Sequence, residues 1–177
     1  MNYQIFAKFV CLKIMGMPYV ILMICLALAL ALQLLTGDFP VLFFSFPLNL
    51  ILAVLWLIAM LWCWKKKSKS LFVRFMLSGG ATIWAVGLFL LSSLLIGISG
   101  WHDFTTSWVF VVVMLYFQSV LLFVILRGWR SATATGARLG SIRWRFLINH
   151  AGILLAVSSA FWGAPDSETL RLQAVRE

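Results

Sequence analysis

Five long apolar stretches, separated by short polar or basic segments, constrain this chain more than any other feature. They cover residues 17–35, 41–64, 75–98, 108–126 and 146–162. Each approaches or exceeds the roughly 17–25 residues that a helix needs to cross a bilayer. Backbone groups in lipid must hydrogen-bond within their own segment, and the runs lack the alternation of barrel strands. Each stretch therefore predicts a membrane-spanning helix.

The charge content of the chain supports the same interpretation. Hydrophobic residues make up 63% of the 177 residues and charged residues 11%, whereas soluble domains contain about 25% charged residues. A water-soluble fold of this length cannot bury so much apolar surface, so lipid must cover much of it. The sequence predicts an all-α, polytopic integral membrane protein. We expect residues 1–177 to form one transmembrane domain of five helices, with a short tail at 163–177.

Basic and acidic residues separate along the chain. With the N-terminus in the cytoplasm, 12 of the 14 basic residues fall in cytoplasmic segments. These residues are Lys8, Lys13, Lys65, Lys66, Lys67, Lys69, Arg74, Arg127, Arg130, Arg138, Arg143 and Arg145. The far side receives the other two and all five acids: Arg171, Arg176, Asp38, Asp103, Asp166, Glu168 and Glu177. The positive-inside rule therefore predicts an N-terminus inside and a C-terminus outside.

The net charge of +9 is explained by this topology. The basic residues flank the predicted spans and form no groove with interleaved aromatic side chains, so we expect no nucleic-acid partner. Their expected roles are orientation and attraction to anionic lipids, worth about 1 kcal/mol per residue near the membrane surface. The lipid bilayer is the first predicted partner.

The first span has an alternative interpretation as a signal peptide. Lys8 and Lys13 precede it, and small residues alternate at Ala27, Ala29 and Ala31, as they do before a cleavage site. The apolar run is nevertheless longer than the roughly 7–15 residues of a signal-peptide core. We expect this segment to be retained as a membrane anchor.

The sequence contains no motif of a soluble enzyme. It has no phosphate-binding loop, no paired carboxylates within a span and no Ser/His/Asp arrangement. Its cysteines form no CxxC pair, so no zinc or redox site is expected. No acid lies inside a predicted span, which argues against a carboxylate-based proton relay or cation transporter. We predict no catalytic residue.

His150 is the main candidate for chemistry, because it lies about one turn into the fifth predicted span. An ionisable residue in a span is a candidate functional residue, since its burial is costly. Neutral imidazole is a good axial ligand for haem iron. The alternative is a histidine that packs between helices and bonds a neighbouring carbonyl. The residues alone leave both interpretations open.

Two arginines and a second histidine are weaker candidates. Arg143 and Arg145 precede His150, where guanidinium groups could pair with haem propionates, although orienting the helix is a sufficient role for both. His102, beside Asp103 in the short outer loop, is the other possible ligand, although a surface histidine usually has no such role.

Small and polar residues recur at helical spacing along the fifth span. Asn149, Gly152, Ala156 and Ala160 form a stripe, which we call the small-residue stripe, where another helix can approach closely. His150 lies about 100° from Asn149 around the helix and would flank such a contact.

Three motifs resemble one known family. Phe46-Pro47-Leu48-Asn49 opens the second span, 145–152 (RFLINHAG) opens the fifth, and Gly163-Ala164-Pro165-Asp166 is followed by Leu170-Arg171-Leu172. This combination resembles the ResB-like (CcsB) membrane subunit of the system II cytochrome c biogenesis machinery. The closest variants are those in which ResB-like and CcsA-like parts are adjacent or fused, and the resemblance covers nearly the whole chain in span order.

The resemblance implies a function in the bacterial cytoplasmic membrane. ResB-like proteins pair with a CcsA-like membrane protein, and the two move haem b across the membrane and attach it to apocytochromes c. A transmembrane histidine of the ResB-like side is proposed to ligate haem in transit, and by position and motif that role falls on His150. The chain lacks the tryptophan-rich haem-handling motif of CcsA-like proteins, so we do not expect it to be an enzyme on its own.

Two other classes of function stay open at this stage. The chain could be a structural or assembly subunit without a ligand, holding a membrane complex together through small-residue faces. Transport of a small solute has less support, because the spans lack intramembrane acids and obvious inverted repeats.

Overall fold

The protein is a bundle of helices in a computed structural model that describes residues 3–66, 70–99, 102–134 and 144–174. Within these residues every regular element is helical, and five helices are long and apolar enough to cross a membrane. Their candidate membrane-spanning parts are Tyr19–Thr36, Leu48–Lys66, Gly79–Ile98, Trp108–Arg130 and Trp144–Asp166. The all-α class and the five spans predicted from the sequence are confirmed. The direction of crossing still rests on the charges along the sequence.

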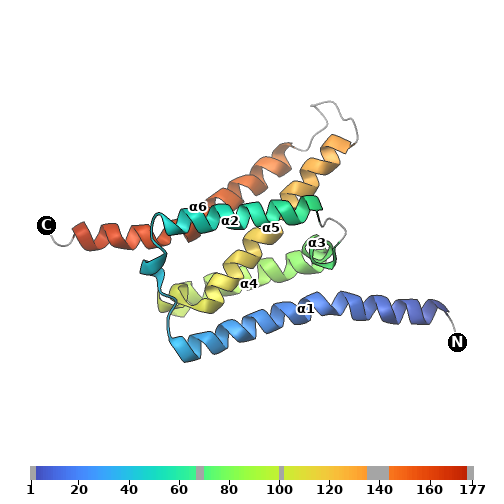
Figure 1. Ribbon diagram of the computed structural model, residues 1–177, viewed down its shortest axis with the longest axis horizontal. Coiled ribbons are helices and arrows are strands. Elements are labelled where there is room, and N and C mark those ends of the chain that lie inside the picture. Colours follow the sequence, from blue (N-terminus) through green and yellow to red (C-terminus); the bar gives the residue numbers. More distant parts are fainter. Residues whose placement is uncertain (1–2, 67–69, 100–101, 135–143, 175–177) are drawn as a thin grey trace.

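Eight helical elements follow one another along the described chain (Figure 1). They are α1 (Tyr3–Thr36), η1 (Val41–Phe44), α2 (Leu48–Lys66), α3 (Leu71–Met76), α4 (Gly79–Ser99), η2 (His102–Thr106), α5 (Trp108–Ala134) and α6 (Trp144–Ala174). The short α3 is seen nearly end-on in Figure 1, so it lies across the direction of the long helices.

Some helix bounds differ from the expected spans for local reasons. The expected span 41–64 divides into η1 and α2 at Pro47, because the residue before a proline is disfavoured in helical conformation. The expected span 75–98 begins at Gly79 instead, since Ser78 Oγ accepts from Ala81 N at 3.1 Å and caps α4. The last helix continues past Trp162 with Pro165 inside it.

Side-chain caps also fix other helix ends. Ser70 Oγ accepts from Val73 N at 3.3 Å at the start of α3, and Ser107 Oγ accepts from Phe110 N at 3.1 Å at the start of α5. Gly37 ends α1 with a φ of 77°, a left-handed conformation that glycine adopts without steric cost.

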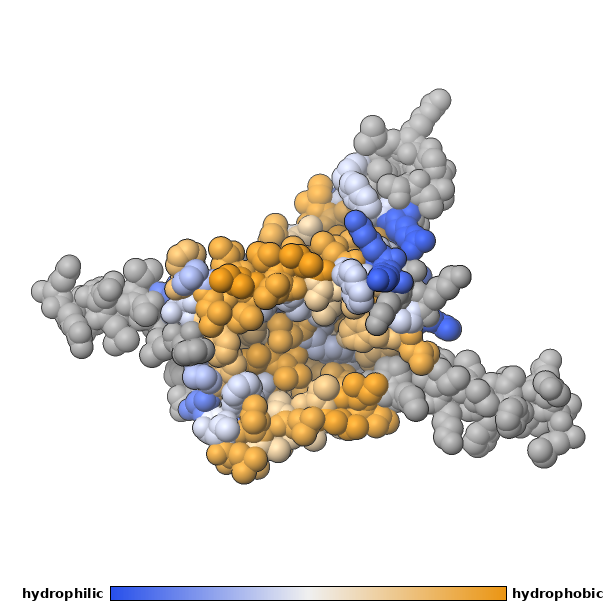
Figure 2. Space-filling view, viewed as in Figure 1, coloured by the Kyte–Doolittle hydropathy of each residue, from blue (hydrophilic) through white to orange (hydrophobic). Residues whose placement is uncertain are grey.

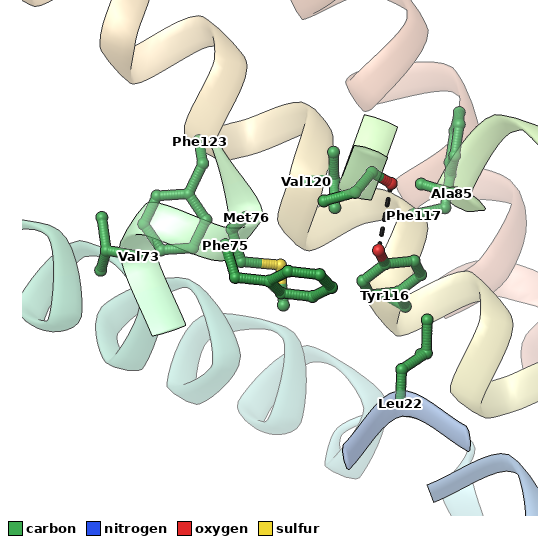
Figure 3. Packing of buried hydrophobic residues seen from close by; sticks show 10 residues of the cluster. Leu22, Val73, Phe75, Met76, Ala85, Tyr116, Phe117, Val120 and Phe123 are labelled. Carbon is green, nitrogen blue, oxygen red and sulfur yellow. Dashed lines mark hydrogen bonds between the residues drawn. The ribbon is translucent and has the colours of Figure 1, made fainter. Parts of the chain in front are cut away.

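Helix α5 is the centre of the bundle. Of its span residues 44% are buried, against 6% in α2 and in α6, and α5 packs against α1, α4 and α6 (Figure 1). The apolar core lies around its middle, where Phe89 stacks on Phe117 at 4.5 Å. Figure 3 shows side chains of α3 facing α5, and Tyr116 Oη donating to the Ala81 carbonyl at 3.0 Å.

Much of the remaining surface is apolar. Figure 2 shows hydrophobic residues over most of the described surface, with hydrophilic residues gathered towards the ends of the helices. Leu28, Leu55, Ile83 and Leu155, from four different long helices, are all more than half exposed. This surface suits a lipid solvent, in which exposed apolar side chains carry no penalty.

The two ends of the bundle differ in charge. We call the end with Asp38 and Asp166 the acidic end; here Phe39 N donates to Thr106 O at 2.7 Å, and Trp108 N donates to Gln33 Oε1 at 3.0 Å. The opposite end is the basic end. Its described cations are Lys65, Lys66, Arg74, Arg127, Arg130 and Arg145.

Candidate functional site

His150 lies in the second turn of α6, half-buried, on the side of the helix that faces the bundle. Its Nδ1 is 2.8 Å from the carbonyl oxygen of Phe146, one turn earlier in the same helix. The Phe146 ring lies against the imidazole, with ring centroids 3.9 Å apart. Among the described residues, the imidazole is therefore oriented by contacts within its own helix.

This hydrogen bond decides which ring nitrogen of neutral His150 is available. A carbonyl oxygen only accepts, so Nδ1 must carry the proton and Nε2 the lone pair. No described residue forms a hydrogen bond with Nε2. A histidine that ligates a metal commonly donates its other N–H to a carbonyl in this way. The donor chemistry of His150 therefore fits an axial ligand for iron.

The other candidate residues that the structure describes do not share the position of His150 in the bundle. Arg145 is exposed near the start of α6, five residues before His150 and about 140° away around the helix. Arg143 lies outside the described residues. The backbone of His102 belongs to η2 at the acidic end, and its side chain is outside what the structure describes. Because His150 is near the basic end, one iron cannot bind both histidines.

The small-residue stripe faces away from the bundle. Asn149, Gly152, Ala156 and Ala160 are all exposed. A Cβ added at Gly152 would meet no atom within 4 Å, so no described helix approaches here. The close approach that α6 does make is at Gly128 of α5, where an added Cβ would lie 3.1 Å from Leu147 Cδ2.

A polar cluster joins α6 to the start of α2 at the acidic end. Asp166 Oδ1 accepts from Phe46 N at 2.8 Å, and Asp166 Oδ2 accepts from Asn49 Nδ2 at 2.9 Å. The same Nδ2 donates to the Trp162 carbonyl at 2.9 Å, and Asn49 is 7% exposed. Both hydrogens of the buried amide are thus used, and polar bonds hold α6 and the start of α2 together at the acidic end.

The position of this cluster follows from Pro165. Proline has no N–H to donate to the carbonyl four residues earlier, and its ring opens the helix there. The Trp162 carbonyl, one residue further along, receives an N–H from Asn49. Figure 1 shows α6 changing direction along its length. The side chain of Asn49 therefore supports α6 next to its proline.

A second set of polar bonds joins α6 to α5. Ser158 Oγ and Trp162 Nε1 both donate to Gln118 Oε1, each at 3.2 Å. Gln118 is fully buried, and its Nε2 has no hydrogen-bond partner among the described residues. Because an indole N–H can only donate, the amide cannot be turned over to satisfy Nε2. The orientation of Gln118 is fixed by α6.

The structure brings together two motifs that are far apart in the sequence. The polar cluster joins the motif Phe46-Pro47-Leu48-Asn49 to the motif Gly163-Ala164-Pro165-Asp166. The residues that form its hydrogen bonds are 117 and 120 positions apart in the sequence. The sequence predicted a tail at 163–177, whereas Asp166 lies within α6 and bonds to Asn49 and Phe46. The sequence signal that could have indicated this contact is Pro165 followed by Asp166 at the end of an apolar run.

Comparison of the chain with protein-family models, with curated proteins and with solved structures gives no match. Among the described residues there is also no group of three or more His, Cys, Asp or Glu side chains arranged to hold a metal ion. The fold and site define a multi-pass helical membrane protein with one oriented, half-buried histidine in its last span.

Proposed function

We propose that this chain is a haem-handling membrane subunit of cytochrome c maturation. In this proposal, haem b in transit is the cargo, His150 is its axial ligand and a CcsA-like synthetase receives it. The bacterial cytoplasmic membrane is the expected location, and apocytochrome c is reached through the partner. The chain supplies a ligand, an apolar surface and orientation, while thioether formation belongs to the partner.

One observation carries the proposal: the bond from His150 Nδ1 to the Phe146 carbonyl leaves Nε2 with a lone pair and no described partner. The resemblance of three motifs to ResB-like proteins suggests haem as the ligand. Two of those motifs are joined by the hydrogen bonds of Asp166 in the polar cluster. The alternative, a packing histidine that bonds a neighbouring carbonyl, would form the same bond, so the haem content of His150→Ala decides between the two.

The proposal gives different roles to the other candidates. Arg145, near the basic end of the same helix, and Arg143 are assigned to the haem propionates through charge-assisted hydrogen bonds. His102 receives no role, because η2 lies at the opposite end of the bundle.

The direct test is the optical spectrum of the purified chain co-expressed with its CcsA-like partner. We expect a Soret band in the wild type and loss of most of that band in His150→Ala, because the axial ligand is removed. Imidazole added to the variant should restore part of the band by occupying the space left by the side chain.

The matched control is the chain's other histidine. His102→Ala should keep the wild-type haem content and band position. An unchanged haem content in His150→Ala, with equal amounts of partner retained, would show that His150 is not the ligand.

A second function is favoured by the exposed small-residue stripe. Its four residues face away from the bundle, where a partner helix can approach, so the chain could be an assembly subunit without a ligand. Gly152→Leu should then reduce co-purification of the partner, whereas Gly87→Leu on exposed α4 should not. A wild-type complex that contains no haem, with that dependence on Gly152, would favour this second function.

A further inference from the structure

Three helix ends meet at the basic end of the bundle. The C-terminal end of α2 carries Lys65 and Lys66, the short α3 carries Arg74, and the last turns of α5 carry Arg127 and Arg130. All of these side chains are exposed, and Figure 2 shows hydrophilic residues gathered at this end. We call these five residues the basic rim.

The two arginines of α5 reach towards different neighbours. Arg127 and Arg130 are three residues apart and share one face of the helix. A terminal nitrogen of Arg127 donates to the Leu77 carbonyl at 3.3 Å. The Arg127 guanidinium therefore lies at the C-terminal end of α3, where Leu77 is three residues after Arg74. The Arg130 guanidinium carbon lies 6.0 Å from the centre of the Trp64 ring, beside Lys65. The pair therefore connects α3 to α2.

Aromatic side chains pack next to the basic rim, between its cations and the core. Trp64 and Phe72 both lie against the buried ring of Phe123, with centroids 5.9 and 6.1 Å away. Lys66 Nζ is 5.4 Å from the centre of the Trp62 ring. Cations held over indole faces keep a defined position, unlike side chains that extend freely into water.

The charge at this end is of one sign. The acidic side chains that the structure describes, Asp38 and Asp166, both lie at the acidic end of the bundle. Apolar side chains flank the rim on the side of the spans: Leu71, Phe72 and Trp62 are 49%, 42% and 48% exposed. An anion with an attached apolar part is complementary to this surface.

We propose that the basic rim is a binding site for the headgroup of an anionic phospholipid. The guanidinium groups of Arg127 and Arg130 bind the phosphate diester, for which their planar forks are suited. The acyl chains lie along the exposed apolar residues next to α3. Exposed apolar surface directly below the cations favours a lipid over free phosphate, which has no apolar part. This proposal does not depend on haem binding.

The first experiment compares ligands on the wild-type chain. Native mass spectrometry of the protein in detergent, with equal amounts of phosphatidylglycerol and phosphatidylcholine, should show at least about threefold more phosphatidylglycerol adducts. Equal occupancy of the two lipids would overturn the proposal. This experiment uses only the wild-type protein, so its outcome does not depend on the folding of a variant. Inorganic phosphate should not compete; displacement of the lipid by millimolar phosphate would mean a site for free anions.

The second experiment locates the site. The double variant Arg127→Gln, Arg130→Gln should bind phosphatidylglycerol roughly thirtyfold more weakly, given about 1 kcal/mol for each of the two cations near the surface. The control Lys8→Gln, Lys13→Gln removes the same charge from the N-terminal part of α1 and should keep wild-type binding. An equal loss in both double variants would show that net charge, and not the basic rim, attracts the lipid.

Discussion

The two ends of α6 are held in different ways. At the acidic end, Asp166 and Trp162 exchange hydrogen bonds with Asn49, Phe46 and Gln118, so α6 is tied to both α2 and α5. At the basic end the helix packs by apolar contact against Gly128, and the one hydrogen bond of the His150 ring among the described residues lies within α6.

The two ends of α6 therefore differ in whether their polar groups stabilise the fold or can bind a ligand. A polar group whose partners are all within the fold stabilises one arrangement and is not available to a ligand. His150 is oriented by one bond and keeps one nitrogen without a described partner, which is what a ligand for a passing cargo requires. The acidic end is expected to fix α6, and the basic end to present its histidine.

The largest effect is expected from removing the carboxylate of the polar cluster. Asp166→Ala leaves Phe46 N–H and one N–H of the buried Asn49 without an acceptor. We expect the free energy of unfolding in mixed micelles to fall by about 1–3 kcal/mol.

The control for Asp166 is Asp38→Ala, an exposed carboxylate at the same end that accepts from Gln33 at 2.8 Å. It should cost less than about 0.5 kcal/mol, as surface substitutions usually do. Equal losses in the two variants would mean that the polar cluster does not hold α6 more firmly than an exposed bond.

An intermediate effect is expected at the close approach of α5 and α6. Gly128→Leu places carbon atoms where Leu147 Cδ2 and Phe146 Cε1 lie 3.1 and 3.3 Å from a bare Cβ. Overpacking of this kind costs about 1–3 kcal/mol, here at the low end because the neighbours are side chains. Thermal unfolding followed by circular dichroism measures the loss.

Gly87→Leu is the matched control for Gly128, because a Cβ at Gly87 would meet nothing within 4 Å. Its midpoint should be unchanged or slightly higher, since leucine has a better helix propensity than glycine. If Gly128→Leu has no lower midpoint than Gly87→Leu, the two helices do not pack at this point.

The smallest effect is expected for the bond between α6 and α5. Gln118→Leu, Trp162→Phe and the double variant form a cycle for the contact of 3.2 Å between Trp162 Nε1 and Gln118 Oε1. We expect a coupling energy of about 0.6 kcal/mol, the average for such bonds in membrane proteins. A coupling well above 2 kcal/mol would show that the buried amide is a main support of the bundle.

Much of the fold could be predicted because a membrane limits the choices of the chain. The five spans were visible as apolar runs, and each expected segment matches one of the long helices within a few residues at one end or both. The separate α3 was missed, because its first four residues fell between two expected spans and Phe75 and Met76 were included in the next one. The site was predicted only in part: His150 was found as a residue, but its bond to Phe146 needs a side-chain conformation that spacing does not give.

The sequence by itself determined the number of spans, the segregation of basic and acidic residues and the presence of one histidine in the last span. Only the tertiary structure decided that α5 is central, that Asn49 supports α6 next to Pro165 and that Arg127 and Arg130 reach α3 and α2. The physical reason lies in what each property depends on. Entry into lipid depends on the summed hydrophobicity of about 20 consecutive residues, whereas contacts between helices depend on single side chains more than a hundred residues apart.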